Sequence, residues 1–368
     1  MIRTTHFRIL IIALLISVMG ILSIYSSNYQ KEDKKWQLIY KRQIYWVILG
    51  LFFFFIMYNL NYRRLWDATY FLYVLSVLLL LLVFILGAVR LGAQRWLRIA
   101  WFNFQPSEIV KLIVIIFLSR YFSAKSSSNV TLTLNNAGIF RALILPFFFV
   151  AIPMVLIIEQ PDLGSGAVVF FIFIAMLYIS GVKLKYLFII FLLSLLFFPI
   201  LWHILRDYQK ERLLVFLNPN IDPLGAGYTI IQSKIAIGSG GFLGKGWLSG
   251  TQGQLHFLPE SHTDFIFATF TEEWGFLGAI MLLILYYLLI KQGIRIAQKT
   301  SDNFARLLAF GISLMLATQV FINIAMTIGL APVVGLPLPL MSYGGSSTLV
   351  TYISLGILVN IDKQRTVF

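Results

Sequence analysis

The sequence predicts an all-α, polytopic integral membrane protein, and three observations support this class. Apolar residues make up 59% of the 368 residues and charged residues only 12%, whereas soluble domains are about half apolar and about a quarter charged. The mean hydropathy is +0.85. Many apolar runs reach roughly 20 residues, the length at which a helix crosses a bilayer while satisfying its own backbone hydrogen bonds.

We predict about ten transmembrane helices in a single membrane domain covering residues 1–368. The first apolar run follows the basic start MIRTTHFR and resembles a signal peptide, but no clear small-residue cleavage site follows it. We therefore interpret it as the first span. The predicted spans cover 7–27, 44–60, 68–88, 107–122, 141–158, 164–181, 184–203, 265–290, 305–329 and 344–360.

An even number of spans places both termini on one side of the membrane. Short cytoplasmic loops are enriched in Lys and Arg, and the early segments MIRTTHFR and NYRRLWD have this character, so both termini are expected to be cytoplasmic. The opposite side also carries cations, among them Arg90, Arg95 and Arg98. An anionic substrate would explain them. The large segment at about 204–264 would then be an extracytoplasmic loop, and its length favours a functional role.

Absent residues exclude some chemistry. The chain has no cysteine, so disulfides, thiol nucleophiles and thiolate metal sites are excluded. The remaining candidates are polar residues at the ends of apolar runs. An ionisable residue inside a membrane is costly and usually faces the bundle interior or water.

The stretch QPSEIVK places Glu108 and Lys111 three residues apart at the start of a span, where they share a helix face and can pair. The pair is either structural or part of a pocket. The stretch EQPDLGSG places Asp162 in a short turn between two spans. Asp162 would cap the next helix, or would stand at the outer mouth of a cavity and hold a cation or a sugar hydroxyl.

The extracytoplasmic segment is rich in glycine, which permits close approach of backbone N–H groups to phosphate. Its spacing does not match a nucleotide P-loop. Arg212, Lys234 and Lys245 favour an anionic ligand, and the alternative is a compact loop that needs tight turns. The glycines are Gly238, Gly240, Gly241, Gly244, Gly246 and Gly250.

The stretch HFLPESHTDFIFATF places a carboxylate where the chain enters an apolar run. Pro259 ends any preceding helix, so Asp264 is expected in the first turn of the next span, facing a cavity. An N-cap is the alternative. A functional carboxylate is favoured because further polar groups gather nearby, namely Glu260, His262, Glu272 and Glu273.

Proline punctuates the stretch APVVGLPLPLMSYGGSSTLV, residues 331–350. Pro332, Pro337 and Pro339 exclude a regular helix there. SYGGSS then provides a flexible, polar entry to the last span. The stretch is either a re-entrant structural plug or part of a pocket for a lipid head group.

Seven stretches carry a resemblance to a known family. GAQRWL, QPSEIVK, EQPDLGSG, FLNPNIDPLGAGY, QSKIAIGSGGFLGKG, FLPESHTDFIFA and LPLPLMSYGGSS occur in this order along the chain. Together they resemble the SEDS family (shape, elongation, division, sporulation) of bacterial cell-wall polymerases. The pair Leu340-Met341 before SYGGSS resembles the elongation members, because division members more often have an aromatic-Ile pair there.

The resemblance implies a peptidoglycan glycosyltransferase of the bacterial cytoplasmic membrane that polymerises glycan strands from lipid II on the extracytoplasmic side. It implies that Asp264 is essential and that Glu108 and Lys111 belong to the site. It also implies a class B penicillin-binding protein and other elongation-complex membrane proteins as partners, and no nucleic acid.

The implied chemistry suits these residues. A sugar 4-hydroxyl must lose a proton as it attacks an anomeric carbon, and one carboxylate suffices as the base. Cationic side chains or a divalent cation, Mg²⁺ or Mn²⁺, would stabilise the departing diphosphate; no organic cofactor is expected. Two alternatives stay open: a division polymerase, and a flippase for lipid-linked precursors in which Glu108 and Lys111 form a gate.

Overall fold

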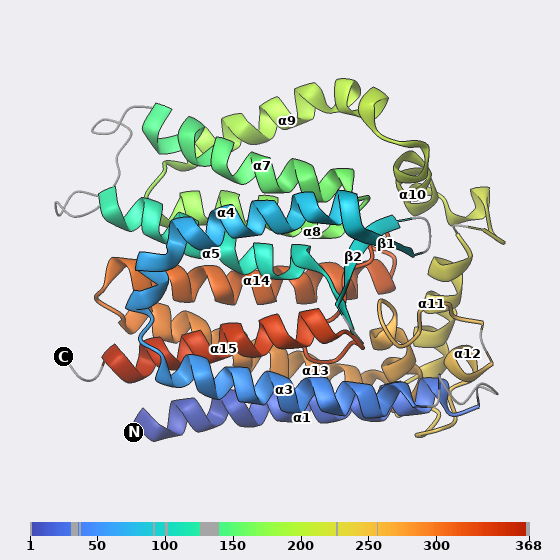
Figure 1. Cartoon of the computed structure of the whole chain (residues 1–368). Coiled ribbons are helices and arrows are strands. Elements are labelled where there is room, and N and C mark those ends of the chain that lie inside the picture. Colours follow the sequence, from blue (N-terminus) through green and yellow to red (C-terminus); the bar gives the residue numbers. More distant parts are fainter. Residues whose placement is uncertain are drawn as a thin grey trace.

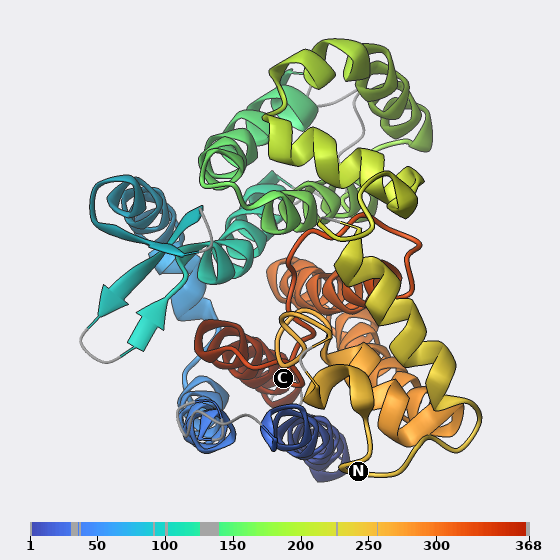
Figure 2. The ribbon, with the colours of Figure 1, turned by 90° about the vertical axis from the view of Figure 1, so that its right-hand side faces the viewer.

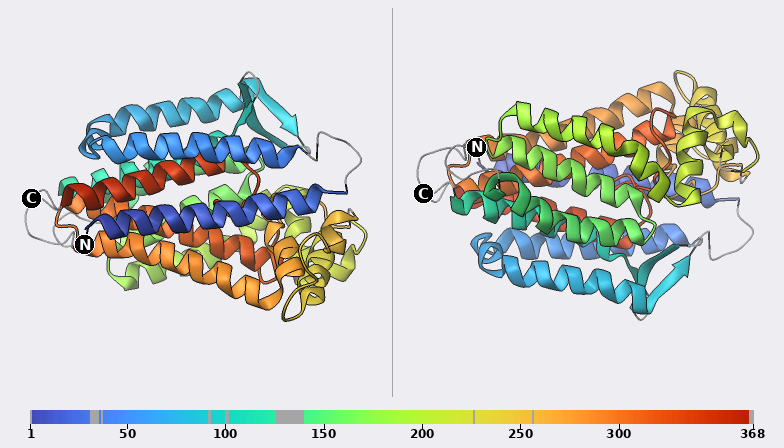
Figure 3. Two further views of the ribbon diagram at one scale, coloured as in Figure 1. Left: turned by 90° about the horizontal axis from the view of Figure 1, so that it is seen from below. Right: turned by 90° about the horizontal axis from the view of Figure 1, so that it is seen from above.

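The computed structural model describes residues 2–30, 36, 38–90, 93–99, 102–125, 140–225, 227–255 and 257–365. The described chain forms a bundle of long helices. The first helix begins and the last helix ends at the same end of this bundle (Figure 1). The shorter elements gather at the opposite end, and Figure 3 shows the same arrangement from two further sides.

Each of the ten predicted spans falls on a helix. These helices are α1 (Ile2–Asn28), α3 (Ile39–Asn59), α4 (Arg63–Leu86), α5 (Pro106–Lys125), α7 (Leu145–Glu159), α8 (Leu163–Ile179), α9 (Leu184–Ile204), α13 (Ile266–Lys299), α14 (Asn303–Thr327) and α15 (Gly345–Arg365). A π-helical turn, Phe140–Ile144, leads into α7. In the described part of the chain, six helices are long and apolar enough to cross a membrane, and α8 is a shorter apolar helix. The protein is therefore polytopic, and the count of ten stays a prediction.

The last helix lies at the centre of packing. Helix α15 contacts α1, α3, α5, α13 and α14, and most of its residues from Ser346 to Asp362 are buried. Helix α3 lies along one side of α15, and α13 and α14 lie together on another (Figure 2). The two ends of the sequence are thus packed together, because α1 also contacts α13 and α15.

A small antiparallel sheet interrupts the helices between α4 and α5. Its strands are β1 (Gly87–Arg90), β2 (Ala93–Ile99) and β3 (Phe102–Phe104), in the order β1-β2-β3. Leu97 pairs with Gly87 on one side and with Phe104 on the other. The all-α prediction missed this sheet, which projects from the bundle in Figure 2. Backbone N–H and C=O groups must find hydrogen-bond partners, and in this short segment they find them between neighbouring strands.

The segment 204–264 is folded rather than an open loop. It contains α10 (Asp207–Leu217), a 3₁₀ turn (Pro219–Ile221), α11 (Tyr228–Gly240) and α12 (Thr251–Gln254). Helix α11 packs on α13, and α12 contacts α1 and α11. These elements lie at the end of the bundle away from the chain ends (Figure 1).

Helix α13 is broken at Gly275, where φ is +64° and ψ is −163°. The glycine-rich stretch supplies the hydrogen bonds that the break leaves open. The amides of Lys245 and Gly246 donate to the carbonyls of Glu272 and Glu273, each at 3.0 Å. A Cβ on Gly244 would overlap the Glu273 carbonyl. The glycines therefore permit close packing of two backbones, and the expected phosphate cradle is not formed by this contact.

Candidate functional site

Asp264 lies in a tight turn before α13. The amides of Thr263 and Phe265 both donate to the Glu260 carbonyl, at 3.1 and 3.3 Å. Helix α13 begins at Ile266, and its N-cap is Phe265, which makes no side-chain cap bond. The expectation that Asp264 belongs to the first helical turn or caps the helix is therefore wrong. The turn leaves Asp264 partly buried just outside the apolar span.

Two arginines from distant segments lie near the Asp264 carboxylate. A Cβ on Gly335 would lie 3.4 Å from Asp264 Oδ2 and 3.9 Å from Arg95 Nη1, so both groups border one small space. Arg95, on β2, donates from Nε to the Gln160 carbonyl at 3.1 Å and from Nη2 to the Pro161 carbonyl. Arg212, on α10, donates from Nη1 to the Val333 carbonyl at 3.1 Å. Carbonyl bonds fix both guanidinium groups.

The surroundings of Asp264 change its acidity. The pKa of Asp264 is raised to about 7: burial and then the neighbouring Glu260 carboxylate raise it, Arg95 and Arg212 lower it, and Asp162 raises it. Burial and the charge of Arg95 lower the pKa of Arg212. A carboxyl that titrates near neutral pH is suited to take up a proton in catalysis.

Asp162 is the N-cap of α8, as one of its two interpretations predicts. Its Oδ1 accepts from the Ser165 amide at 3.2 Å. Its Oδ2 accepts from Gln105 Nε2 at 3.0 Å and from Ser107 Oγ at 2.9 Å. These bonds tie the start of α5 to the start of α8, and both carboxylate oxygens are engaged.

Glu108 and Lys111 form the predicted ion pair. Lys111 Nζ lies 2.7 Å from Glu108 Oε1, and the two side chains are only 0% and 3% exposed. The pair follows Ser107 directly on α5, so it adjoins the contact with Asp162. The structural and the pocket-lining interpretations both fit this position.

The other predicted polar residues do not converge on Asp264. Glu272 is buried and accepts from Lys245 Nζ at 2.7 Å, and also from the Thr251 amide and hydroxyl at 2.8 and 2.9 Å. Glu273 accepts from Ser26 Oγ on α1. Lys245, Glu272 and Glu273 thus anchor α12, α13 and α1 to one another. Nearness in the sequence led us to group Glu272 and Glu273 with Asp264, but they lie within α13, whereas Asp264 lies in the turn before it.

The remaining two candidates belong to the turn itself. Glu260 is exposed and accepts from Thr263 Oγ1 at 2.9 Å. The His262 ring is buried, with ring centroids 5.5 Å from Trp36 and 5.9 Å from Tyr343. His262 therefore packs in an aromatic cluster, and Glu260 acts on Asp264 through its charge.

Sequence reasoning missed Arg95 as a site residue. Arg95 was counted only among the cations of the outer side, since nothing in GAQRWL separates it from Arg90 or Arg98. The strand β2 places it against the turn that follows α7, where it reaches the space beside Asp264.

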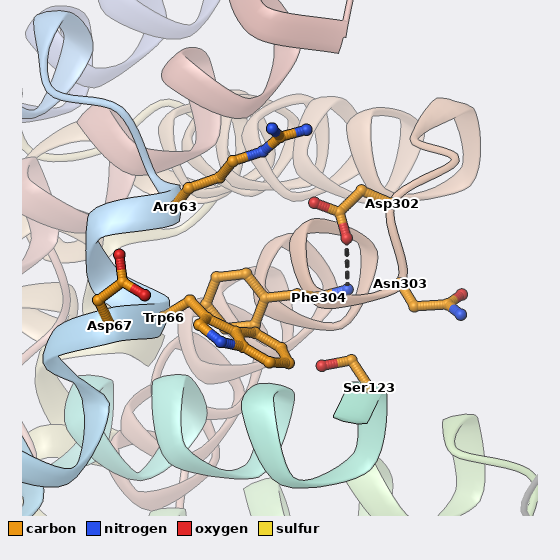
Figure 4. Close-up of a pocket in the computed structure, with 7 residues that line it drawn as sticks. All are labelled: Arg63, Trp66, Asp67, Ser123, Asp302, Asn303 and Phe304. Atoms are coloured by element: carbon orange, nitrogen blue, oxygen red, sulfur yellow. Dashed lines mark hydrogen bonds between the residues drawn. The ribbon is translucent and has the colours of Figure 1, made fainter. Parts of the chain in front are cut away.

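A metal ion has no ready site among the described residues. In that part of the chain no three His, Asp, Glu or Cys side chains stand together as metal ligands. The described residues also line a hollow of about 560 Å³ between Arg63, Trp66, Asp67, Ser123, Asp302, Asn303 and Phe304 (Figure 4). It opens at the starts of α4 and α14, at the opposite end of the bundle from Asp264. Asp302 there caps α14 at Phe304 and accepts from Tyr62.

Known proteins resemble this chain over most of its length. A profile of the FtsW/RodA/SpoVE family, described as "Cell cycle protein", matches residues 6–367. Peptidoglycan glycosyltransferase MrdB of Escherichia coli K12 is 44% identical over 326 residues, 88% of this chain and 86% of that protein. The probable peptidoglycan glycosyltransferase FtsW of Geobacter metallireducens is 36% identical over 363 residues, 97% of this chain and 94% of that protein.

Two solved structures are similar over nearly the whole chain. One, described as "Structural coordination of polymerization and crosslinking by a peptidoglycan synthase complex", has a TM-score of 0.81 at 32% identity and covers 97% of both chains. The other, rod shape determining protein RodA of Thermus thermophilus, has a TM-score of 0.69 at 28% identity and covers 97% of this chain and 96% of that one. The chain therefore belongs to the FtsW/RodA/SpoVE family, the SEDS family that its motifs resemble.

Proposed function

We propose that the chain is a peptidoglycan glycosyltransferase of the elongation type, which joins lipid-linked disaccharide units into glycan strands with Asp264 as the general base. The observation that carries the assignment of the base is the single space bordered by Asp264 Oδ2 and Arg95 Nη1, with Arg212 nearby. The relatives support the activity: two are named peptidoglycan glycosyltransferases. The higher identity to MrdB and the likeness to a rod shape determining protein support elongation.

The reaction needs one base and a stabilised leaving group. The acceptor sugar's 4-hydroxyl attacks the anomeric carbon of the donor, the carbon–oxygen bond to the lipid diphosphate breaks, and the configuration inverts. Asp264 takes the hydroxyl proton in the transition state. Arg95 and Arg212 then face the charge that develops on the diphosphate, and fixed guanidinium groups in a partly dry site stabilise such charge strongly.

The site is proposed to lie on the extracytoplasmic side, with both termini in the cytoplasm. The end of α15 and the start of α1 lie together, at the opposite end of the bundle from α10, α11 and α12 (Figure 1), and an even number of spans would put both termini on one side. Lipid II has its tail in the bilayer and its sugars outside, so a base directly before α13 lies at the correct depth.

If a divalent cation takes part, we propose that it arrives bound to the diphosphate of the substrate and is not held by the protein alone. The described carboxylates do not form a resident metal site, and both oxygens of Asp162 are engaged. Mg²⁺ is commonly bound through substrate phosphates with one or two carboxylates. The residues therefore do not fit a protein-held ion, and no step of the reaction is assigned to one.

A class B penicillin-binding protein is the proposed partner. One structural neighbour belongs to a complex described as coordinating polymerization and crosslinking. Lipid II, the growing strand and other elongation-complex membrane proteins are the remaining proposed partners. The partner would dock through a membrane helix, where close packing and few polar contacts decide affinity.

Asp264→Asn tests the assignment. The amide keeps the shape of the side chain but accepts no proton, so strand synthesis from labelled lipid II by detergent-purified protein should be lost. Glu260→Gln is the matched control, because Glu260 lies in the same turn but is exposed, and it should retain most of the activity. Near-normal synthesis by Asp264→Asn would refute the base. Absence of polymer from the unaltered protein would favour a transporter, which needs a sealed membrane.

A further inference from the structure

The turn that carries Asp264 is held through three successive backbone carbonyls. The His262 carbonyl accepts from the Tyr343 amide at 2.9 Å. The Thr263 carbonyl accepts from Ser342 Oγ at 2.6 Å. The Asp264 carbonyl accepts from Asn323 Nδ2 at 2.9 Å. Every donor comes from α14 or from the segment 331–344 that follows it, so the position of the carboxylate depends on residues 59 to 81 positions later in the chain.

Asn323 joins the turn to that segment with one amide group. Its Nδ2 also donates to the Leu336 carbonyl at 2.7 Å, so the two N–H bonds of a single nitrogen hold two separate stretches of chain together. The side chain is 0% exposed. A buried polar group is costly unless it is hydrogen-bonded. Oδ1 of Asn323 has no partner among the described residues, so the two bonds from Nδ2 are the contacts that offset the cost of burying this amide.

Ser342 provides a further bond between the Asp264 turn and the segment 331–344; we call Asn323 and Ser342 together the clamp. Its Oγ accepts from the Leu338 amide at 2.8 Å while it donates to Thr263, and it is 3% exposed. The same segment carries Gly335, beside Asp264 Oδ2. The motif SYGGSS thus has a defined contact with the catalytic turn through Ser342 and Tyr343.

We propose that Asn323 and Ser342 are positioning residues for Asp264, which hold its turn against the segment 331–344 and thereby fix the direction of the base. This proposal rests on the proposed function. A reacting group displaced by about 1 Å loses roughly 100-fold in rate. The charges around Asp264 belong to Glu260 in its own turn, Arg95 on β2, Arg212 on α10 and Asp162 before α8, and neither positioning residue carries one.

The test compares Asn323→Ala with Asn360→Ala in the purified full-length protein. Asn360 is a matched buried amide, 1% exposed, which donates to the Tyr58 carbonyl at 2.8 Å and accepts from the Tyr62 amide at 3.1 Å, at the other end of the bundle. We expect Asn323→Ala to lower kcat for lipid II polymerisation by roughly 10- to 100-fold with KM little changed. Asn360→Ala should lower thermal stability without this loss.

The pH profile separates positioning from general destabilisation. A loosened turn admits water to Asp264, so the acid limb of the kcat profile should move to lower pH in Asn323→Ala and should not move in Asn360→Ala. Labelling of the Asp264 carboxyl by a carbodiimide, followed by peptide mass spectrometry against pH, gives the same midpoint without requiring polymerisation. This readout distinguishes failure of the clamp from failure of the proposed function.

Ser342→Ala provides a milder variant should Asn323→Ala fold poorly, with Ser354→Ala as its control. Ser354 is also buried, and among the described residues its hydroxyl donates within its own helix, to the Val350 carbonyl at 2.7 Å. Ser342→Ala should show the same directions at a smaller size. An unmoved acid limb and labelling midpoint in both clamp variants, or equal losses in the clamp and control variants, would overturn the proposal.

Discussion

The losses of stability caused by Glu108→Ala and by Lys111→Ala should add up to more than the loss caused by the double variant. Each single alanine substitution leaves the other charge in a site that is almost fully buried, and an unpaired buried charge costs about 3–5 kcal/mol. The two single costs therefore add to about 6–10 kcal/mol. The double variant leaves no charge behind and loses only packing, about 2–5 kcal/mol.

A double-mutant cycle measures this difference. The free energy of unfolding is followed by tryptophan fluorescence as a denaturing detergent is added to micelles. We expect a coupling energy of several kcal/mol between Glu108 and Lys111. The control cycle uses Glu159 and Arg206, whose oxygen and nitrogen lie 2.5 Å apart but whose side chains are about half exposed; it should give about 0–1 kcal/mol.

The result would also decide between the two interpretations of the pair. If its role is structural, the double variant should polymerise lipid II once it is folded, whereas a pocket-lining pair would leave it folded and inactive. Additive single losses, or a coupling no larger than that of the exposed control pair, would refute the reasoning from burial.

Three further outcomes are expected. The polymerisation rate should rise with pH through about 7, because burial raises the pKa of Asp264 and only the deprotonated carboxylate accepts the proton; a rate independent of pH across that range would contradict the base. Arg212→Ala should lower kcat by roughly 100-fold, the usual loss when one stabilising donor is removed, with Arg212→Lys as a partly active comparison in steady-state kinetics. Gly275→Ala should lower the unfolding free energy by about 1–3 kcal/mol, since φ is +64° there, and unchanged stability in detergent unfolding would contradict the strain.

The helical framework could be predicted because it depends on local properties. Apolar runs bounded by charges and prolines predicted ten segments, and each is a helix in the structure. The hairpin of Gly87–Ile99 could not be predicted in the same way. Its backbone groups are satisfied across strands, and the strand sequences GAVR and AQRWLRI show no regular alternation of apolar and polar residues that would predict them.

The candidate site was predicted only in part. Asp162 and the pair Glu108–Lys111 lie where the motifs placed them, at the starts of α8 and α5, whereas Asp264 lies in the turn before α13 and not in its first helical turn. For the glycine-rich stretch the sequence favoured an anionic ligand and left a compact loop with tight turns as the alternative, because glycine exposes backbone N–H groups in both cases. Its amides instead donate to the carbonyls around Gly275, a break in α13 that hydropathy does not reveal.

The groups that surround Asp264 come from every second connection along the chain. Arg95 lies between the third and fourth predicted spans, Asp162 between the fifth and sixth, Arg212 between the seventh and eighth, and Ser342 between the ninth and tenth. Successive membrane helices alternate in direction, so these connections must all lie on one side. The sequence thus predicts that they share a face of the membrane.

A shared side of the membrane does not by itself bring these connections into contact. Their contact depends on how the helices that they join pack together. Arg95 is fixed by the carbonyls that follow α7, and Arg212 by the carbonyl of Val333. Asn323, on α14, then joins the segment 331–344 to the turn before α13. A bond between backbone carbonyls and a side chain many residues away leaves no periodic signal in the sequence. Asp264, the proposed base, is specified by its motif, but its orientation is specified by residues that only the folded bundle brings to it.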